Sequence, residues 1–229
     1  MIIALNNKSN LGKDDFLCYQ QELAEIKTNH QIIVCPTFLN INLYDIDFPL
    51  GAQNVSSKEE GAHTGEISAE DLYNSGVEYC IVGHSERRQE QKESLEEINE
   101  KIKRLQENGI TPILCVGETK EERDQNRVKD VLEIELASAI KEIDTSNLII
   151  AYEPIWSIGT GIIPTNEEIK AVFEYIKSIF PNNKVLYGGS ANEKNIDTLK
   201  QISLIDGYLV GGLSLKPESL KLFLQKLDQ

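Results

Sequence analysis

Hydrophobic and polar residues follow two alternating patterns along the whole chain. Short runs of β-branched and aliphatic residues are typical of strands buried on both faces, and apolar residues spaced three and four apart predict helices between them. The predicted strands are Ile2–Asn7, Ile32–Cys35, Leu50–Asn54, Tyr79–Gly83, Thr111–Val116, Leu148–Glu153, Val185–Tyr187 and Tyr208–Val210. The predicted helices are Lys13–Lys27, Phe38–Tyr44, Ser68–Ser75, Ser94–Asn108, Val128–Ile143, Asn166–Ile179, Glu193–Gln201 and Pro217–Leu227.

This repeat of strand and helix predicts the fold class. Eight such units follow one another across residues 1–229 without a linker or low-complexity segment, which indicates one α/β domain with a parallel sheet. Eight units close a (β/α)8 barrel, and ~200 residues are long enough to build one. A doubly wound open sheet is the structural alternative, and it is weakened because no GxGxxG pattern follows the first strand.

Composition narrows the range of partners. The formal net charge of −14 argues against nucleic acid or an anionic membrane. No apolar stretch approaches membrane-spanning length, and the opening MIIALNNKSN is too short an apolar run for a secretion signal. The four cysteines are scattered without metal-ligand spacing, so we expect a reducing cytoplasm and no metal site. His30 and His63 belong to no motif and are interpreted as surface residues.

The stretch Ala151–Gly161, AYEPIWSIGTG, predicts a reactive group beside a loop that closes. Glu153 ends an aliphatic run and precedes Pro154, which restricts its backbone to extended conformations. The loop that follows carries apolar residues and two glycines, whose backbone N–H groups can approach an anion closely. We therefore expect a catalytic carboxylate next to a lid that touches a phosphate, although an isolated segment of this kind is more often an ordinary connection.

Further polar and glycine-rich positions follow other predicted strands. In a (β/α)8 barrel the carboxyl ends of the strands meet at one mouth, where catalytic groups lie. The positions at these ends are Asn6 and Lys8, His84 and Glu86, Glu153, Gly188 to Ser190, and Gly211 with Gly212. A base, a cation, a histidine and several anion contacts are thus expected around one cavity.

Six motifs in the same order along the chain resemble the triosephosphate isomerase family. They are the Asn6–Lys8 segment, GHSERR (Gly83–Arg88), CVGET (Cys115–Thr119), AYEPIWSIGTG, YGGS (Tyr187–Ser190) and YLVGGLSLKPE (Tyr208–Glu218). The resemblance covers the whole chain and implies interconversion of dihydroxyacetone phosphate and D-glyceraldehyde 3-phosphate without cofactor or metal. Asn7 is a departure from the pattern, because the family usually has an aromatic residue between the asparagine and the lysine.

The resemblance also implies roles for individual residues. Glu153 would be the general base, and His84 would be a neutral hydrogen-bond donor to the enediolate. Lys8 would supply the cation and Asn6 would orient the substrate, with Glu86 supporting them. The residues expected to bind substrate or phosphate are Asn6, Lys8, Gly159, Ser190, Leu209, Gly211 and Gly212. Arg88 has no role that the sequence can suggest.

Two loops complete the expectation. Residues Pro154–Ile163 would form the lid, latched by Tyr187, and Val55–Glu66 resembles the loop through which the family forms homodimers. Two other functions remain open at this point. One is isomerisation of a related four-carbon sugar phosphate, and the other is a non-catalytic phosphate-binding barrel, which would not need Lys8, His84 and Glu153 together.

Overall fold

The strands alternate with helices as the hydrophobic pattern predicts. The computed structural model describes residues 1–229. The strands are β1 (Ile2–Asn6), β2 (Gln31–Cys35), β3 (Gly51–Ala52), β4 (Tyr79–Val82), β5 (Thr111–Val116), β6 (Ile149–Tyr152), β7 (Val185–Tyr187) and β8 (Gly207–Val210). They form one eight-stranded parallel sheet in the order β2-β1-β8-β7-β6-β5-β4-β3.

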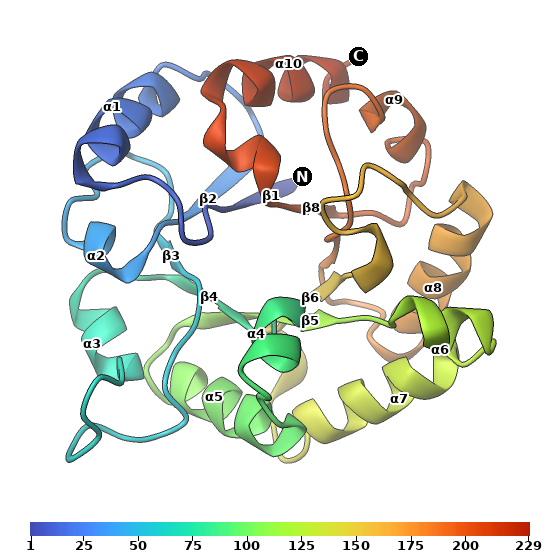
Figure 1. Cartoon of the computed structure of the whole chain (residues 1–229), viewed down its shortest axis with the longest axis horizontal. Coiled ribbons are helices and arrows are strands. Elements are labelled where there is room, and N and C mark those ends of the chain that lie inside the picture. The colour runs from blue at the N-terminus through green and yellow to red at the C-terminus, as the bar shows by residue number, and fades with distance from the viewer.

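The helices surround the strands (Figure 1). They are α1 (Lys13–Ala24), α2 (Phe38–Ile41), α3 (Ala69–Asn74), α4 (Ser85–Glu90), α5 (Leu95–Glu107), α6 (Lys120–Asp124), α7 (Val128–Ala139), α8 (Asn166–Ile179), α9 (Ile196–Leu199) and α10 (Pro217–Leu227). The 3-10 segments are η1 (Thr145–Asn147), η2 (Ile155–Ser157) and η3 (Gly212–Leu215). None of these helices combines the length and the hydropathy needed to cross a bilayer.

The two outer strands of this order meet, so the sheet closes into the predicted (β/α)8 barrel. β2 and β3 are joined by one bridge, Val34 to Leu50, and the Val34 amide donates to the carbonyl of Pro49 at 3.0 Å. In Figure 1 α4 lies in front of the strands, so the view is onto their carboxyl ends. The open-sheet alternative is therefore excluded.

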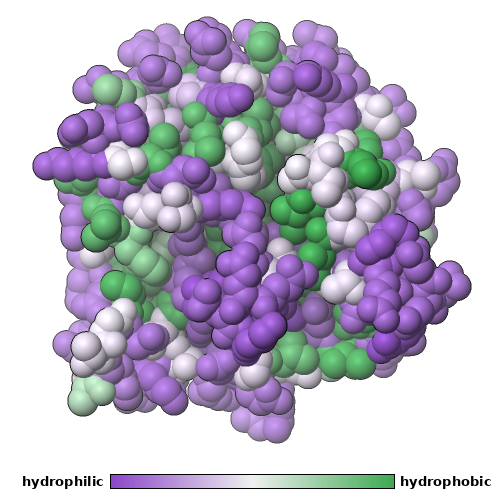
Figure 2. Space-filling view, in the orientation of Figure 1, coloured by the Kyte–Doolittle hydropathy of each residue, from purple (hydrophilic) through white to green (hydrophobic).

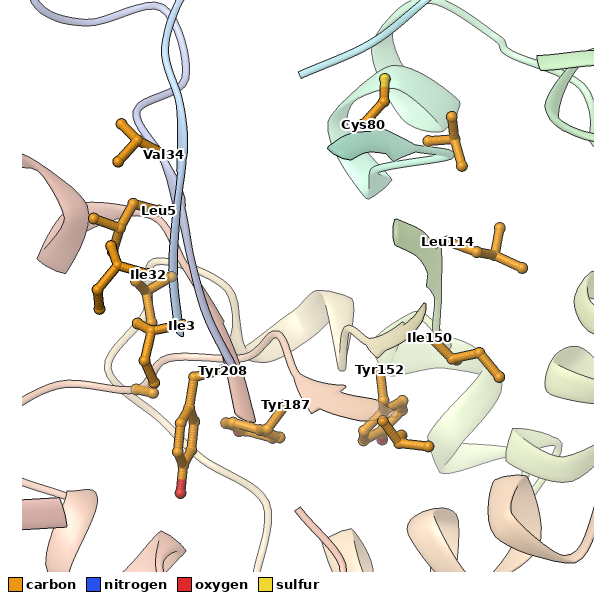
Figure 3. Packing of buried hydrophobic residues seen from close by; sticks show 14 of the residues in the cluster. Ile3, Leu5, Ile32, Val34, Cys80, Leu114, Ile150, Tyr152, Tyr187 and Tyr208 are labelled. Carbon is orange, nitrogen blue, oxygen red and sulfur yellow. The ribbon is translucent and has the colours of Figure 1, made fainter. Parts of the chain in front are cut away.

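Alternate residues of each strand enter different cores, because successive side chains point to opposite faces. Ile3 and Leu5 belong to the larger core between strands and helices, of which Figure 3 shows a part. Ile2 and Ala4 belong to a smaller cluster made only of strand residues, which fills the barrel interior. Burial on both sides explains why the strands are apolar throughout.

Capping boxes fix where several helices begin. Ser68, Ser94, Thr119 and Thr165 each accept a hydrogen bond from the amide three residues on, and the acidic side chain at that position bonds back to the cap. The start of each of these helices is therefore determined by residues that lie within four positions of one another in the sequence.

Several predicted element bounds are wrong. Strand β3 has two residues, where Leu50–Asn54 was expected, and the Gln53 side chain beyond it bonds to the carbonyls of Lys8 and Cys35. Helix α9 is shorter than the predicted Glu193–Gln201, because the Asn195 side chain bonds to the Asn192 amide and the Ser190 carbonyl ahead of it. Helices α1, α2 and α7 end three or four residues early, whereas α4 and α6 are additional.

Candidate active site

The predicted site residues converge at the carboxyl ends of the strands. A cavity of ≈ 370 Å³ opens there, and its walls include Asn6, Lys8, His84, Glu153, Gly159, Ser190, Leu209, Gly211 and Gly212. Glu86 lies beside it, in an adjoining cavity that also includes Lys8 and His84. Figure 2 shows this end of the molecule as mainly hydrophilic, with hydrophobic residues in small separate groups. Residues from most of the barrel strands thus face one space.

Glu153 follows β6 and is almost fully buried, with 2% of its surface exposed. One carboxylate oxygen lies 3.1 Å from Nε2 of His84, and the other accepts the Ser85 amide hydrogen at 3.0 Å. Burial acts to raise the pKa of Glu153, but His84, the Ser85 amide and Lys8 outweigh burial and lower it. The carboxylate is therefore ionised in this arrangement, and its basicity is restrained by its two hydrogen-bond partners.

His84 is the N-cap residue of α4. Its Nδ1 accepts the backbone N–H of Glu86 at 3.3 Å, which assigns the ring proton of a neutral imidazole to Nε2, facing Glu153. Burial acts to lower the pKa of His84, whereas the charge and hydrogen bond of Glu153 raise it, and the net direction is upward. Lys8 also acts to lower the pKa of His84, and Glu86 acts to raise it. A neutral ring in this orientation can donate a hydrogen bond from Nε2.

Lys8 sits on an unusual backbone at the end of β1. Its φ is 53°, the left-handed region that side-chain-bearing residues adopt at a cost of about 1 kcal/mol or more. Two side chains hold it there: Asn6 Oδ1 accepts the Lys8 amide at 3.0 Å, and Gln53 donates to the Lys8 carbonyl at 2.8 Å. The Lys8 ammonium donates to Glu86 Oε1 at 2.5 Å. These contacts place the cation in the cavity.

Opposite Glu153 the cavity has the features of an anion site. Gly211 precedes the 3-10 segment η3 and Gly212 begins it, and amides at a helix start attract anions. A Cβ at Gly211 would lie 3.1 Å from Cε of Lys8, so glycine lets the lysine stem pass close to this backbone. Ser190 closes this wall, with its hydroxyl donating to the Ser157 carbonyl at 2.7 Å. Oriented amides and one lysine therefore face the same space.

The segment Pro154–Ile163 lies over the cavity edge and is held from below by a buried carboxylate. Glu118 is fully buried and accepts hydrogen bonds from Trp156 Nε1 at 3.0 Å and from Arg123 Nε at 2.9 Å. The Tyr187 hydroxyl is buried and has no hydrogen-bond partner. A latch role for Tyr187 stays a prediction.

Sequence reasoning missed several residues that support the site. Asn7 is 1% exposed, and its side chain donates to the Ser214 hydroxyl at 3.2 Å, which ties β1 to η3. The residues next to Asn7 in the sequence indicate only the end of a strand, so no local sequence pattern predicts its contact with Ser214. His30 is also misjudged: it is partly buried, and its Nε2 lies 3.1 Å from Asp228, whereas His63 is exposed as expected.

The remaining predictions about this site concern metals, thiols and the long loop. No group of three or more metal-ligating side chains comes together in the structure. All four cysteines are unpaired. Residues 58–66, most of the predicted dimer loop, are exposed.

Fold and site define an enzyme of the (β/α)8-barrel class, with acid–base groups and an anion site at one mouth. A family model described as triosephosphate isomerase matches residues 1–227. A triosephosphate isomerase of Nostoc punctiforme is 44% identical over 204 residues, which covers 86% of this chain and 84% of the relative. One of Neurospora crassa is 43% identical over 230 residues, covering 93% of each chain. One of Trichodesmium erythraeum is 42% identical over 220 residues, covering 93% of this chain and 91% of the relative.

The chain belongs to the triosephosphate isomerase family. It interconverts dihydroxyacetone phosphate and D-glyceraldehyde 3-phosphate, a reaction of glycolysis.

Proposed function

We propose that Glu153, His84, Lys8 and Asn6 perform this isomerisation in the cavity at the barrel mouth. The observation that carries the proposal is the 3.1 Å contact between Nε2 of His84 and the carboxylate of Glu153. A buried carboxylate paired with an imidazole is a recurrent arrangement for moving a proton between adjacent carbons. Both residues line the same cavity as Lys8 and the glycines of the anion site.

Glu153 is the general base in this proposal. It removes a proton from the hydroxyl-bearing carbon next to the substrate carbonyl and returns a proton to the former carbonyl carbon, through an enediolate. The hydroxyl proton passes from the oxygen of the first carbon to the oxygen of the former carbonyl by way of Nε2 of His84. The hydrogen bonds from His84 and the Ser85 amide, which lower the pKa of Glu153, must loosen before the carboxylate reaches substrate. Their loss raises the basicity of Glu153 as the proton transfer begins.

His84 and Lys8 stabilise the negative oxygen that forms. The Nε2–H of His84 donates to the substrate oxygens, and the Lys8 ammonium adds a positive charge from the opposite side. Donors placed in advance in a cavity shielded from water contribute on the order of 3–4 kcal/mol each to such a barrier. Asn6 orients the substrate and holds the Lys8 amide, and Glu86 restrains the lysine until substrate arrives.

The phosphate binds to backbone amides at Gly159, Ser190, Gly211 and Gly212, next to Leu209 at the end of β8. Partial positive charge at the start of η3 and the nearby Lys8 support this assignment. Such a site explains how a dianion is held by a chain of net charge −14. The reaction needs no cofactor, because proton transfer alone completes it.

The lid is the segment Pro154–Ile163, which we propose closes over the substrate. Closure keeps water away and prevents the enediolate from losing its phosphate. Tyr187 would latch the closed lid with its unpartnered hydroxyl. The unexplained exposure of Ile162, 61%, also supports a segment that has a second position.

A coupled assay of glyceraldehyde 3-phosphate isomerisation tests the base. Glu153→Gln is expected to lower kcat by about 10²–10⁴-fold, the usual contribution of a positioned general base. Glu167→Gln, an exposed carboxylate on α8, is the matched control and should leave kcat unchanged. A Glu153→Gln enzyme as active as wild type would overturn the assignment.

We also propose a cytoplasmic homodimer that assembles through Val55–Glu66, with Thr64 and Gly65 at its tip. The exposed loop and Leu39 on α2, which is 89% exposed, support a second copy as the partner. The four free thiols support a reducing compartment. Sedimentation at micromolar concentration tests the dimer, and a mass near 25.7 kDa would contradict it.

A further inference from the structure

Arg88, which has no role in the reaction described above, makes three hydrogen bonds from one guanidinium group. Its Nε donates to the Gly83 carbonyl at 2.7 Å, one of its terminal nitrogens donates to the Cys115 carbonyl at 2.7 Å, and the other to Glu135 Oε1 at 2.8 Å. Gly83 is the residue before His84, and Cys115 lies near the end of β5. The Arg88 side chain is 14% exposed. One planar fork thus joins β4, β5 and α7 directly behind the catalytic mouth.

Glu135 carries this connection to the catalytic base. Its second oxygen accepts the amide hydrogen of Gly117 at 2.9 Å. Gly117 packs directly on Glu153, since a Cβ at Gly117 would lie 1.7 Å from the Glu153 carbonyl oxygen. The Glu153 amide in turn donates to the Val116 carbonyl at 2.7 Å. The chain of contacts therefore runs from Gly83 through Arg88 and Glu135 to the backbone of Glu153.

We propose that the Arg88–Glu135 ion pair positions the two proton-handling residues. It fixes the carboxyl end of β4 that presents His84, and through Gly117 it fixes the backbone that presents Glu153. This inference rests on the proposed roles of His84 and Glu153. Neither Arg88 nor Glu135 lines the substrate cavity, so both act through those two residues.

The chemistry of the two side chains suits this task. Arginine offers several donors in a rigid plane, so it can serve two carbonyls and a carboxylate together, whereas lysine cannot hold the same geometry. Burial, with smaller effects from the carboxylates of Glu122 and Glu153, raises the pKa of Glu135 to about 7 in spite of Arg88 and the Gly117 amide. Glu135 therefore adds negative charge near Glu153 as pH rises through about 7, and Arg88 balances that charge.

The test uses two conservative variants, Arg88→Lys and Glu135→Gln, because alanine at either position leaves a buried charge that threatens folding. For Arg88→Lys we expect kcat to fall by about 10- to 100-fold, the size expected for a small displacement of catalytic groups. We expect KM to stay within about twofold, because most of the proposed phosphate contacts lie on the β7 and β8 loops.

For Glu135→Gln we expect a second, electrostatic signature. Loss of the Glu135 charge leaves Arg88 unbalanced near Glu153, which lowers the pKa of Glu153. Because Glu135 ionises only as pH rises through about 7, kcat should fall most near and above pH 7, and the electrostatic part of the loss should fade in acid. The double variant should be no less active than the less active of the two single variants, because the two residues act as one unit.

The matched control is Asp206→Asn at the opposite end of the barrel. Asp206 accepts from Lys177 at 2.6 Å and from the Val185 amide at 2.9 Å, the same combination of cation and backbone N–H. This variant should lower the melting temperature with kcat and the pH profile unchanged. If Arg88→Lys and Glu135→Gln behave in the same way as Asp206→Asn, the proposal is overturned. An active Glu153→Gln enzyme would instead refute the underlying roles, so the two failures are distinguishable.

Discussion

The hydroxyl of Ser157 donates a hydrogen bond to the carbonyl oxygen of Ile162, with 2.6 Å between the two oxygens. This bond joins the two ends of the tip of the proposed lid, so residues 157–162 form a loop closed by a hydrogen bond. The Ser157 carbonyl meanwhile accepts the Ser190 hydroxyl, which connects the same loop to the anion site.

Ser157→Ala should therefore produce a leaky lid. We expect more inorganic phosphate released per turnover. When the loop opens, water reaches the enediolate, and the enediolate can adopt conformations from which phosphate is lost. Ser178→Ala is the control, since Ser178 is an exposed residue of α8 that makes a similar bond to the Tyr175 carbonyl. Equal phosphate release from wild type and Ser157→Ala would contradict the prediction.

Glu118→Gln should destabilise the barrel beneath the lid. The substitution removes the charge that pairs with Arg123, whose side chain is 13% exposed, and disturbs the bond to Trp156. Arg123 keeps its ion pair with Glu168 at 2.8 Å, so we expect a loss of about 1–3 kcal/mol, the usual size for a lost hydrogen bond to a charged group. Denaturant unfolding measures the loss, and fluorescence of Trp156, the only tryptophan, reports on the lid. A loss below about 1 kcal/mol would contradict the prediction.

Gly117→Ala should be far more harmful than an ordinary glycine substitution. The new Cβ would overlap the Glu153 carbonyl oxygen, so the strand end that presents the base has to move. We expect destabilisation above about 3 kcal/mol and loss of most activity. Gly12→Ala is the control, because its nearest neighbour would lie 3.9 Å away. Similar melting temperatures for the two variants would disprove the argument.

Asp206 should make stability depend on pH in acid. Burial acts to raise the pKa of Asp206, but the bonds from Lys177 and the Val185 amide outweigh it and lower the pKa. A carboxylate with a depressed folded-state pKa contributes stability above its unfolded value of about 4 and loses it as pH falls through the folded value. The melting temperature of Asp206→Asn should therefore fall less than that of wild type between pH 5 and pH 2 (about the range in which such groups titrate). Parallel curves would contradict this.

Sequence alone predicts the barrel and its mouth because both depend on local patterns. Each local pattern can be recognised within a few residues of the sequence. The patterns are an aliphatic strand, a capping serine or threonine, and a polar residue at a strand end. Parallel strands then bring their carboxyl ends together, so the sequence alone places Asn6, His84 and Glu153 at one cavity. The predicted end of β3 was wrong because the Gln53 side chain donates hydrogen bonds to two carbonyls distant in the sequence, which a local pattern does not reveal.

The supporting contacts could not be predicted for a different reason. Arg88 and Glu135 are 47 positions apart, and their pairing depends on how α4 and α7 pack around β5. The same holds for Asn7, whose partner Ser214 lies 207 positions away. A single sequence gives no register between elements so distant, so such contacts become visible only in three dimensions.

The closure of the barrel between β2 and β3 has a consequence for how the molecule unfolds. Every other neighbouring pair shares at least two residue pairs, whereas here one bridge, Val34 to Leu50, completes the ring. Partial opening starts where the fewest bonds must break, so amide hydrogen exchange should reach this seam before the β1–β8 side. Because β3 leads directly into Val55–Glu66, a partner that grips that loop would also clamp the seam and slow the exchange there.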